Sequence, residues 1–261
     1  PPVSAWFVKG LFQIFGSQDW AYYFLSQLFV VSSFFIVYKF SEDFFKNRIF
    51  SLISILLLEG IYFHNFTTPE FNVYVCQLPF RALTVYFCWK SFKNNDIQSW
   101  LLFGAFATLG FLSHYLFLYL LIATTIFFIF VIIKEKKFNL KYFIPGTLFL
   151  ILILPHLVWL TENNYTTFNY AFHRTGLSES TYFNHLFHPF IFLAKQIGIL
   201  LPFLFMFLII ASKVKIKLQK KDQKLLFLLI INFIPLILVI LTAFFMGAKI
   251  RTMWMSPFYL F

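Results

Sequence analysis

Charged side chains are scarce in this sequence. They make up 12% of its 261 residues, whereas a soluble domain averages roughly 25%. Hydrophobic residues reach 60%, aromatic residues reach 23%, and the mean hydropathy is +0.79. So few charges cannot cover a water-facing surface of this size. The composition therefore predicts a polytopic membrane protein and argues against a soluble one.

Other features that would indicate soluble enzymes are also missing. We find no P-loop, no GxGxxG, no HExxH and no serine-centred nucleophile elbow, which removes the chemistries that those motifs carry but not chemistry within a membrane. The chain has two cysteines, Cys76 and Cys88, both in one apolar run. On one helix they would stand about 18 Å apart, which excludes an intrahelical disulfide. We interpret them as small buried residues.

The two ends of the sequence lack the marks of a complete chain. The sequence starts Pro1-Pro2 without a methionine or a signal-peptide pattern, and Phe261 falls inside an apolar run. We therefore expect a fragment of a longer protein, with residues 1–261 forming a single transmembrane domain.

Apolar runs separated by short polar breaks predict the spans. A helix needs about 20 apolar residues to cross the hydrocarbon of a bilayer. Ser113-His114 alone separates two runs, which predicts a tight hairpin, and a further run begins at about 253. The sequence thus predicts an all-α polytopic transmembrane bundle with spans at 20–40, 49–64, 72–91, 98–112, 115–133, 142–160, 190–212 and 225–244.

The net charge of +11 comes mostly from lysines in alternate breaks. This distribution follows the positive-inside rule rather than the pattern of a nucleic-acid groove. The lysine-rich breaks at 39–48, 90–97, 134–141 and 213–224 are expected to face the cytoplasm. The breaks at 1–19, 65–71, 113–114, 161–189 and 245–252 are expected to face the periplasm or a lumen.

The first segment is apolar but short for a span. Its bulky residues recur at helical spacing while Lys9 and Gln13 lie on another face, and Gly16-Ser17 follows. We expect an amphipathic helix in the outer interface that ends at this Gly-Ser step. The bulky residues are Trp6, Phe7, Leu11, Phe12 and Phe15.

Two ionisable residues, Glu59 and Arg81, lie inside predicted spans. Burying such groups costs free energy, so each needs a reason. Glu59 and Arg81 belong to neighbouring runs joined by the loop of Glu70, and an arginine side chain is long enough to join them. A buried ion pair between the two runs is the first interpretation. A role on a substrate or proton path is the second.

A second set of polar residues is expected on the outer face. Glu70 follows Pro69 in "HNFTTPEFNVYV" without a nearby cation; it is either a solvated loop acid or a reacting group. Lys249 and Arg251 depart from the charge rule, so they either anchor the interface or hold a phosphate or an anionic head group. His173 and Arg174 are surface or site residues. His185 and His188 have metal-compatible spacing without a third ligand, which favours two interfacial histidines.

Several stretches together resemble one family. "PPVSAWFVKGLFQIFGSQDWAYYFLSQL", "TTPEFNVYVCQLPFRALTVYF", "PHLVWLTENNYTTFNYAFHRTG" and "GAKIRTMWMSPFYL" are similar, in this order, to outer-face regions of bacterial relatives of protein O-mannosyltransferases. These are GT-C fold glycosyltransferases, which include the aminoarabinose transferase of lipid A and the core-galacturonosyl transferases. The resemblance covers essentially the whole sequence.

This resemblance implies transfer of a sugar from a polyprenyl-phosphate donor to a lipid, glycan or protein acceptor at the outer face of a bacterial inner membrane. The family's first acidic residue would precede Pro1. Glu70 would occupy the second acidic position, as base or metal partner. His173 lies near a metal-binding position of the family, so a divalent cation is a possible cofactor. Lys249, Arg251, Arg174 and Lys9 would bind substrate, while Arg81 departs from the family's apolar aromatic pattern.

Two rival functions remain at this point. A transporter or flippase would use a similar bundle, although inverted repeats and matched helix breaks are not visible. A non-catalytic membrane scaffold would have no reason to hold Lys249 and Arg251 against the charge rule. The sequence therefore favours the glycosyltransferase.

Overall fold

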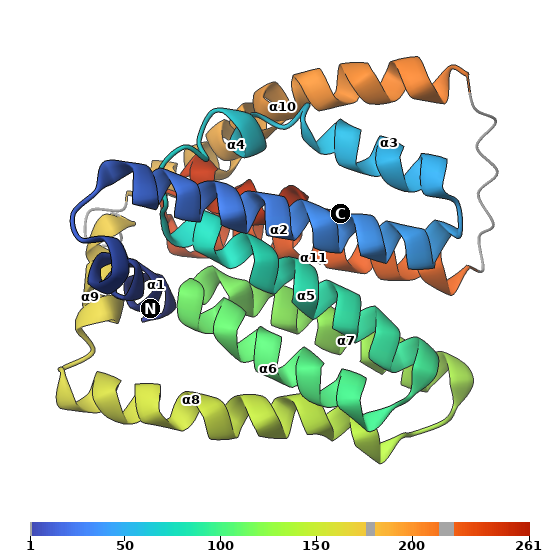
Figure 1. The fold of residues 1–261 in the computed structure, drawn as a ribbon, viewed down its shortest axis with the longest axis horizontal. Helices are drawn as coiled ribbons and strands as arrows, with labels where there is room; N and C mark the ends of the chain where they lie inside the picture. The colour runs from blue at the N-terminus through green and yellow to red at the C-terminus, as the bar shows by residue number, and fades with distance from the viewer. Residues whose placement is uncertain (1, 176–180, 214–221) are drawn as a thin grey trace.

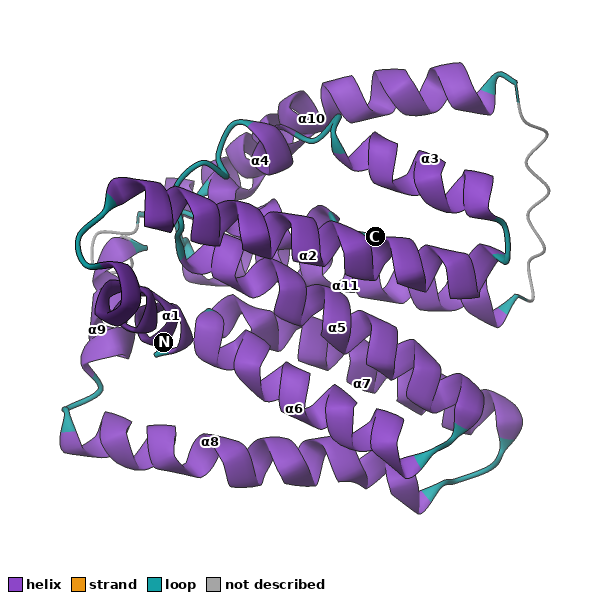
Figure 2. Cartoon of the chain, viewed as in Figure 1, coloured by secondary structure: helices purple, strands orange, loops and turns teal. Residues whose placement is uncertain are grey.

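The computed structural model describes residues 2–175, 181–213 and 222–261, and within these ranges the regular elements are all helical (Figures 1 and 2). This confirms the predicted all-α fold. Four lysines of the predicted break at 213–224, Lys215, Lys217, Lys220 and Lys221, lie outside the described residues. The helices are α1 (Val3–Phe15), α2 (Asp19–Phe45), α3 (Arg48–Leu58), α4 (Tyr62–Asn65), α5 (Val73–Asn94), α6 (Ile97–Ser113), η1 (Tyr115–Phe117), α7 (Leu118–Glu135), η2 (Leu140–Phe143), α8 (Ile144–Glu162), α9 (Thr166–Arg174), α10 (Tyr182–Ala211), α11 (Gln223–Met246) and η4 (Thr252–Tyr259).

Helices occupy all eight predicted spans, with three differences in extent. Five are long and apolar enough to cross a membrane: α2, η1 with α7, η2 with α8, α10 and α11. The run 49–64 is divided into α3 and α4, because the backbone turns at residues 59–61. Helix α10 begins eight residues before its predicted span, and the apolar run after 253 begins with the 3-10 helix η4.

Polar side chains fix where several of these helices begin. Asn47, Asn72, Asp96 and Asp222 each accept a hydrogen bond from a backbone N–H in the first turn of the following helix, and this satisfies donors that a helix start leaves unpaired. The predicted stop of α1 is also confirmed. Gly16 has a φ of 68° and its N–H bonds the carbonyl of Phe12, a conformation that glycine adopts without steric cost.

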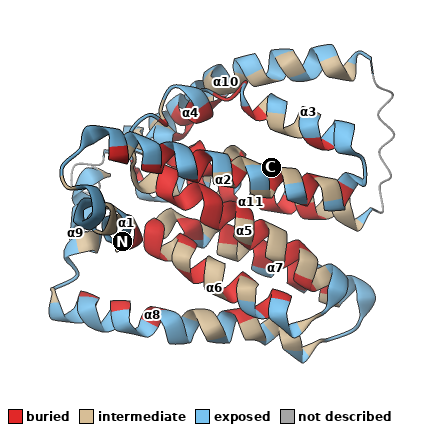
Figure 3. Ribbon diagram, viewed as in Figure 1, coloured by how far each residue is buried: buried red, intermediate tan, exposed pale blue. Residues whose placement is uncertain are grey.

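Helix α5 forms the centre of the bundle. It packs against α2, α6 and η4, whereas α7 and α10 pack on α11, α8 packs on α6, and α3 packs on α2 and α10. Figure 3 shows the buried residues gathered on α5 and on the helix faces around it. Cys76 and Cys88 are both fully buried free thiols on α5, as the sequence predicted. Helix α8 and α10 instead present long rows of exposed apolar side chains, which a bilayer would cover.

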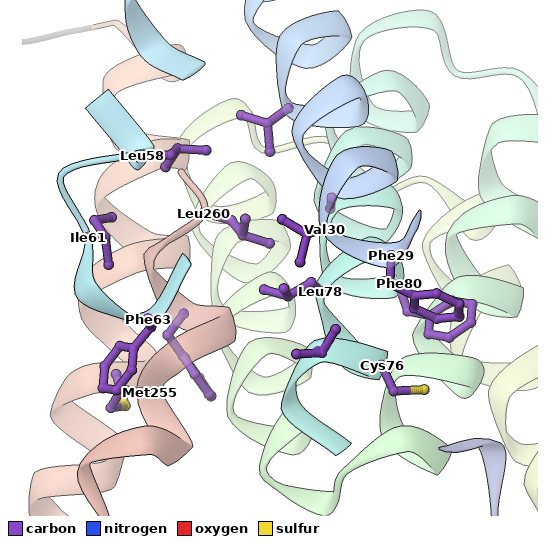
Figure 4. Packing of buried hydrophobic residues seen from close by; sticks show 14 of the residues in the cluster. Phe29, Val30, Leu58, Ile61, Phe63, Cys76, Leu78, Phe80, Met255 and Leu260 are labelled. Atoms are coloured by element: carbon purple, nitrogen blue, oxygen red, sulfur yellow. The ribbon is translucent and has the colours of Figure 1, made fainter. Parts of the chain in front are cut away.

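The last residues described, 252–261, lie inside the bundle. Met255, Phe258 and Leu260 are almost completely buried, and Figure 4 shows Leu260 near Leu58 and Leu78, and Met255 beside Phe63. The aromatic ring of Phe261 meets Phe40 of α2 edge-on. This segment therefore runs from the end of the bundle that carries α1 and α9 into the bundle interior. We call that end the outer end, and the opposite one the lysine-rich end (Figure 1).

The expected ion pair between Glu59 and Arg81 is not formed. Glu59 is exposed at the end of α3, and α3 packs on α2 and α10 and not mainly on α5. Arg81 is 1% exposed, and its guanidinium lies 4.1 Å from the centre of the Phe258 ring. The prediction was wrong because it assumed that consecutive apolar runs form a packed pair. The internal C-terminal segment occupies the side of α5 where Arg81 lies.

Candidate functional site

Two neighbouring pockets lie at the outer end of the bundle. The first, which we call the rim pocket, has a volume of about 410 Å³. Residues from the start of α5, the turn after α6, helix α9 and the start of η4 surround it. They are Val73, Tyr74, His114, Tyr115, Leu116, Thr166, Thr167, Tyr170, Ala171, Arg174, Thr175 and Trp254.

The tight turn between α6 and η1 places two polar side chains in the rim pocket. A Cβ on Gly110 would lie 2.2 Å from the Phe117 ring, so only glycine allows the chain to turn back so closely. The predicted hairpin at Ser113-His114 is thereby confirmed, and His114 and Tyr115 follow at its tip. The backbone N–H of Leu116 donates to Nδ1 of His114 at 3.3 Å.

His114 is held in its neutral form. Burial lowers the pKa of this imidazole from 6.5 to about 4, and the positive charge of Arg174 lowers it further, since both disfavour a second positive charge. Its ring lies 5.1 Å from that of Tyr74 and 6.4 Å from that of Trp254, between ring centres. His114 thus contributes an aromatic, uncharged surface to a pocket whose charge comes from arginine.

Arg174 supplies the positive charge in the wall of the rim pocket. It is the last residue of α9, and its Nη1 donates to the hydroxyl of Tyr170 at 2.5 Å, one turn earlier. Arg174 and Arg251 both lie within electrostatic reach of the Tyr74 hydroxyl. Arg174 thus brings a guanidinium group to an aromatic-lined pocket, an arrangement suited to an anionic group such as a phosphate.

The second pocket, which we call the lateral pocket, adjoins the first and has a volume of about 620 Å³. It is mostly apolar and lies between α1, α6, α8 and α9. Its lining residues are Pro2, Ala5, Trp6, Leu112, Leu152, Pro155, His156, Trp159 and Thr167. Several residues of α8 here, Leu152 and Trp159 among them, have exposed side chains on a membrane-spanning helix. The bilayer is therefore the natural neighbour of this pocket.

A small hydrogen-bonded group separates the two pockets. The Tyr115 hydroxyl lies 2.8 Å from Nε2 of His156 and 3.0 Å from Oγ1 of Thr167. Tyr115 lines the rim pocket, His156 lines the lateral pocket, and Thr167 lines both. The ring of Tyr115 also stacks on Phe168 with centres 5.1 Å apart. This group fixes α8 and α9 relative to the turn after α6.

Glu70 lies in the connection between α4 and α5, close in sequence to the rim-pocket residues Val73 and Tyr74. The carbonyl of Thr68 accepts hydrogen bonds from Ser26 and Gln27 of α2, which holds this connection in place. The carboxylate of Glu70 is exposed and lines neither pocket; in residues 2–175, 181–213 and 222–261 it has no hydrogen-bond or ion-pair partner. The structure therefore places Glu70 at the outer end without a direct contact to the predicted cations.

The other predicted site residues are spread over the same end. Lys249 is exposed, and its backbone N–H donates to the carbonyl of Thr175 at 3.0 Å, which joins the end of α9 to the chain before η4. Lys9 is exposed on α1, the helix that contributes Trp6 to the lateral pocket. Of the predicted site residues, Arg174 alone is among the residues that line the two pockets. Arg251 lies within electrostatic reach of the pocket residue Tyr74, as Arg174 does.

A metal site is not assembled among the described residues. His173 is exposed on α9, and no three His, Cys, Asp or Glu side chains in the described part of the chain gather as a ligand set. His185 and His188 act differently, because their Nδ1 atoms lie 2.7 and 2.8 Å from the carbonyl oxygens of Phe244 and Gly247. These two histidines bind the carbonyls that the end of α11 leaves free.

Sequence reasoning missed most of the aromatic and hydroxyl residues of the two pockets. Tyr74, Tyr115, Thr167, Tyr170 and Trp254 are common residues in any membrane chain, so residue type alone does not single them out. His156 offered a signal, since it is a histidine within a predicted span, and an ionisable group at that depth calls for a partner. Its partner, Tyr115, comes from a turn 41 residues earlier.

Comparison with known proteins gives one match. The sequence model of a family described as dolichyl-phosphate-mannose-protein mannosyltransferase matches residues 1–159, more than half of the chain. Neither a search of curated proteins nor a search of solved structures finds a match. The matched range contains Glu70, both pocket-lining histidines and the turn that carries Tyr115.

Proposed function

This chain belongs to the dolichyl-phosphate-mannose-protein mannosyltransferase family, and on that premise we propose that its two outer pockets bind a polyprenyl-phosphate sugar and present it for transfer. The family makes the protein a membrane glycosyltransferase with a lipid-linked sugar donor. The proposal concerns which residues hold that donor, which face the reaction uses and what accepts the sugar.

The adjacency of the two pockets supports this proposal. The lateral pocket is apolar and borders the membrane-facing surface of α8, which suits the isoprenoid chain. The rim pocket is aromatic and carries Arg174, with Arg251 close by, which suits the phosphate and the sugar ring. A donor with its phosphate at Arg174 would keep its lipid portion in the bilayer while its sugar faces outward. Lys249 and Lys9 lie on the same end and would add long-range attraction for the phosphate.

The reaction requires a base for the acceptor and stabilisation of the leaving phosphate. The acceptor hydroxyl forms a bond to the anomeric carbon of the sugar, and the bond from that carbon to the phosphate oxygen breaks with its electron pair. In our proposal the acceptor's proton passes to the Glu70 carboxylate, and the guanidinium groups of Arg174 and Arg251 stabilise the negative charge of the released polyprenyl phosphate. Glu70 must approach the rim pocket for this step, because it lies outside the pocket wall.

Further aspects of the proposal follow from charge and topology. We propose that the lysine-rich end faces the cytoplasm of a bacterial cell and the outer end faces the periplasm, with residues 1–261 acting as one transferase domain. The acceptor is a lipid, glycan or protein of the cell envelope. A divalent cation, where the reaction uses one, would have Glu70 and His173 among its ligands, and the proton transfer described above requires only the Glu70 carboxylate.

The proposal is tested by measuring release of labelled sugar from a polyprenyl-phosphate donor by the full-length protein in membranes. Glu70→Gln should lower transfer at least about tenfold, because a general base contributes about 10²–10⁴-fold. Glu59→Gln is the matched control, since it removes an exposed carboxylate outside both pockets and should leave turnover unchanged. Unchanged turnover in Glu70→Gln would remove Glu70 from the site. Movement of intact donor across the membrane without sugar release would favour the transporter.

A further inference from the structure

The lysine-rich end of the bundle has a concavity of its own, at the opposite end from both outer pockets. It has a volume of about 770 Å³, within the range of about 300–1,000 Å³ that is typical of small-molecule sites. We call it the lysine pocket. The ends of α2, α5 and α7 and the start of α11 line it with Asp43, Lys46, Trp89, Phe92, Lys93, Lys134, Glu135, Asp222, Gln223 and Lys224.

The three carboxylates of this pocket are bound to groups other than lysine ammoniums. The Tyr86 hydroxyl donates to Asp43 at 3.2 Å, and Nε2 of Gln223 donates to Glu135 at 2.7 Å. Asp222 accepts the backbone N–H of Lys224 at 2.9 Å, as the cap of α11. The three carboxylates therefore accept hydrogen bonds from Tyr86, from Gln223 and from the first turn of α11.

None of the four lysines of this pocket has an ionic partner among the described residues. In the part of the chain that the structure describes, ion pairs occur only at Glu42, with Lys39 and Arg48. Residues 214–221, which lie outside that part, contain no aspartate or glutamate, so they add no carboxylate either. Lys224 is held separately, since its Nζ bonds the Phe44 carbonyl and lies 5.2 Å from the centre of the Phe44 ring. Lys46, Lys93 and Lys134 remain unpaired around one cavity.

The usual places of lysine, at helix ends and in cytoplasmic breaks, explain part of this positive charge. They do not explain why lysines from three helix ends surround one pocket. A lysine in the last turn complements the negative end of a helix, and lysines mark cytoplasmic breaks. Neither effect requires lysines from three separate helix ends to surround one concavity, where their mutual repulsion is unfavourable. Two aromatic residues, Trp89 and Phe92, also line the pocket. Trp89 is buried, and its indole N–H has no acceptor among the described residues. The pocket thus combines four ammonium groups and three carboxylates, an excess of one positive charge, with two aromatic rings.

We propose that the lysine pocket binds a phosphate-bearing anion. Ammonium groups act as point charges toward phosphate, and basic pockets between transmembrane helices on the cytoplasmic side suit phospholipid head groups. The phosphate belongs either to an anionic phospholipid or to a soluble phosphate compound. This site is separate from the outer pockets and does not depend on the proposed transfer reaction.

Two binding measurements on the full chain distinguish these sources. In detergent, calorimetric titration with inorganic pyrophosphate tests the soluble ligand. In nanodiscs of phosphatidylcholine with and without phosphatidylglycerol, native mass spectrometry counts retained phosphatidylglycerol and tests the lipid. Binding in either arm that weakens at high salt supports the proposal, and the arm in which it occurs identifies the source.

A triple variant and a matched control assign the binding to the pocket. Lys46→Gln, Lys93→Gln and Lys134→Gln together should weaken binding about a hundredfold, since each cation near an anionic head group contributes several-fold. The control combines Lys90→Gln, Lys136→Gln and Lys137→Gln, which remove the same charge from the same end outside the cavity. Lys46 and Lys136 are both left-handed helix ends, so the two variants carry similar backbone effects. Equal losses in both variants, or no phosphate binding by the unmodified chain, would overturn the proposal.

Discussion

The Arg81 guanidinium lies over the Phe258 ring, 4.1 Å from its centre, and no carboxylate is paired with it in the described ranges. Its Nη2 makes one long contact of 3.5 Å to the Ile231 carbonyl, while Nε and Nη1 have no partner there. Burial removes the hydration of this guanidinium, and so few contacts do not compensate for the free energy that this costs. The cation–π contact with Phe258 is then its main attachment to the C-terminal segment.

We therefore expect Arg81→Met to preserve or raise stability, because replacing a poorly satisfied buried charge by an apolar chain of similar length is often neutral or stabilising by about 1–4 kcal/mol. Phe258→Ala should instead lower stability by about 3–5 kcal/mol, since it leaves a cavity beneath the arginine. Thermal unfolding of both variants in the same detergent makes the comparison. A strongly destabilised Arg81→Met protein would mean that this arginine has a partner that the static contacts do not reveal.

Removing the Tyr115 hydroxyl should affect both stability and donor binding. Tyr115→Phe leaves His156 and Thr167 without their shared partner, at a cost of about 1–3 kcal/mol, and it loosens the wall between the two pockets. Unfolding temperature should fall and KM for the donor should rise.

Tyr119→Phe is a suitable control for this experiment. Its hydroxyl lies 2.7 Å from Oγ1 of Thr242, outside both pockets. It should lower the unfolding temperature similarly while leaving KM unchanged. If the two variants have the same KM, the Tyr115 group has only a structural role.

Arg174 should determine how tightly the donor phosphate is held. Arg174→Gln is expected to raise KM for the donor by about tenfold to a hundredfold, as a charged hydrogen bond contributes about 1.5–3 kcal/mol. Arg174→Lys should recover only part of this, because an ammonium cannot bind two phosphate oxygens as a planar guanidinium does. Arg48→Gln, at the lysine-rich end, serves as the charge control. Initial-rate kinetics over a range of donor concentrations would show whether KM or kcat changes.

His114 should make the protein less stable in acid. Its pKa is lowered from 6.5 to about 4 in the folded chain, so between these values the unfolded chain binds a proton that the folded chain does not. Stability then falls as the pH falls through this window and levels off below it. His114→Gln should flatten the dependence of unfolding temperature on pH, whereas His173→Gln, which changes an exposed imidazole, should not. Parallel curves for the unmodified protein and His114→Gln would contradict this assignment.

Much of the fold could be predicted because the hydropathy and charge of successive segments indicate where the helices begin and end. The spans, the hairpin at Ser113-His114 and the end of α1 at Gly16 each follow from local signals, and the structure has them. The placement of η4 inside the bundle could not be predicted in the same way. An apolar stretch that packs within a protein has the same composition as one that begins a span.

The site was less predictable than the fold for a related reason. Arg174 was identified as a cation on a polar outer loop, and it does line the rim pocket. Tyr115 and His156 depend on contacts between residues distant in sequence, and tyrosine at a helix boundary is ordinary in a membrane protein. The role of Glu70 stays a prediction, because its exposed carboxylate lines neither pocket.

The two histidine contacts at the outer end of α10 have a mechanical consequence. Helix α10 has 30 residues, or about 45 Å at 1.5 Å per residue, and buries only Pro189, Phe192 and Gln196. His185 and His188 attach it to the final carbonyls of α11. A helix longer than the hydrocarbon layer must tilt or bend. Because α3, α4 and η4 also contact α10, a thinner bilayer would bend this helix rather than turn it as a rigid rod, with the imidazole pair holding its outer end.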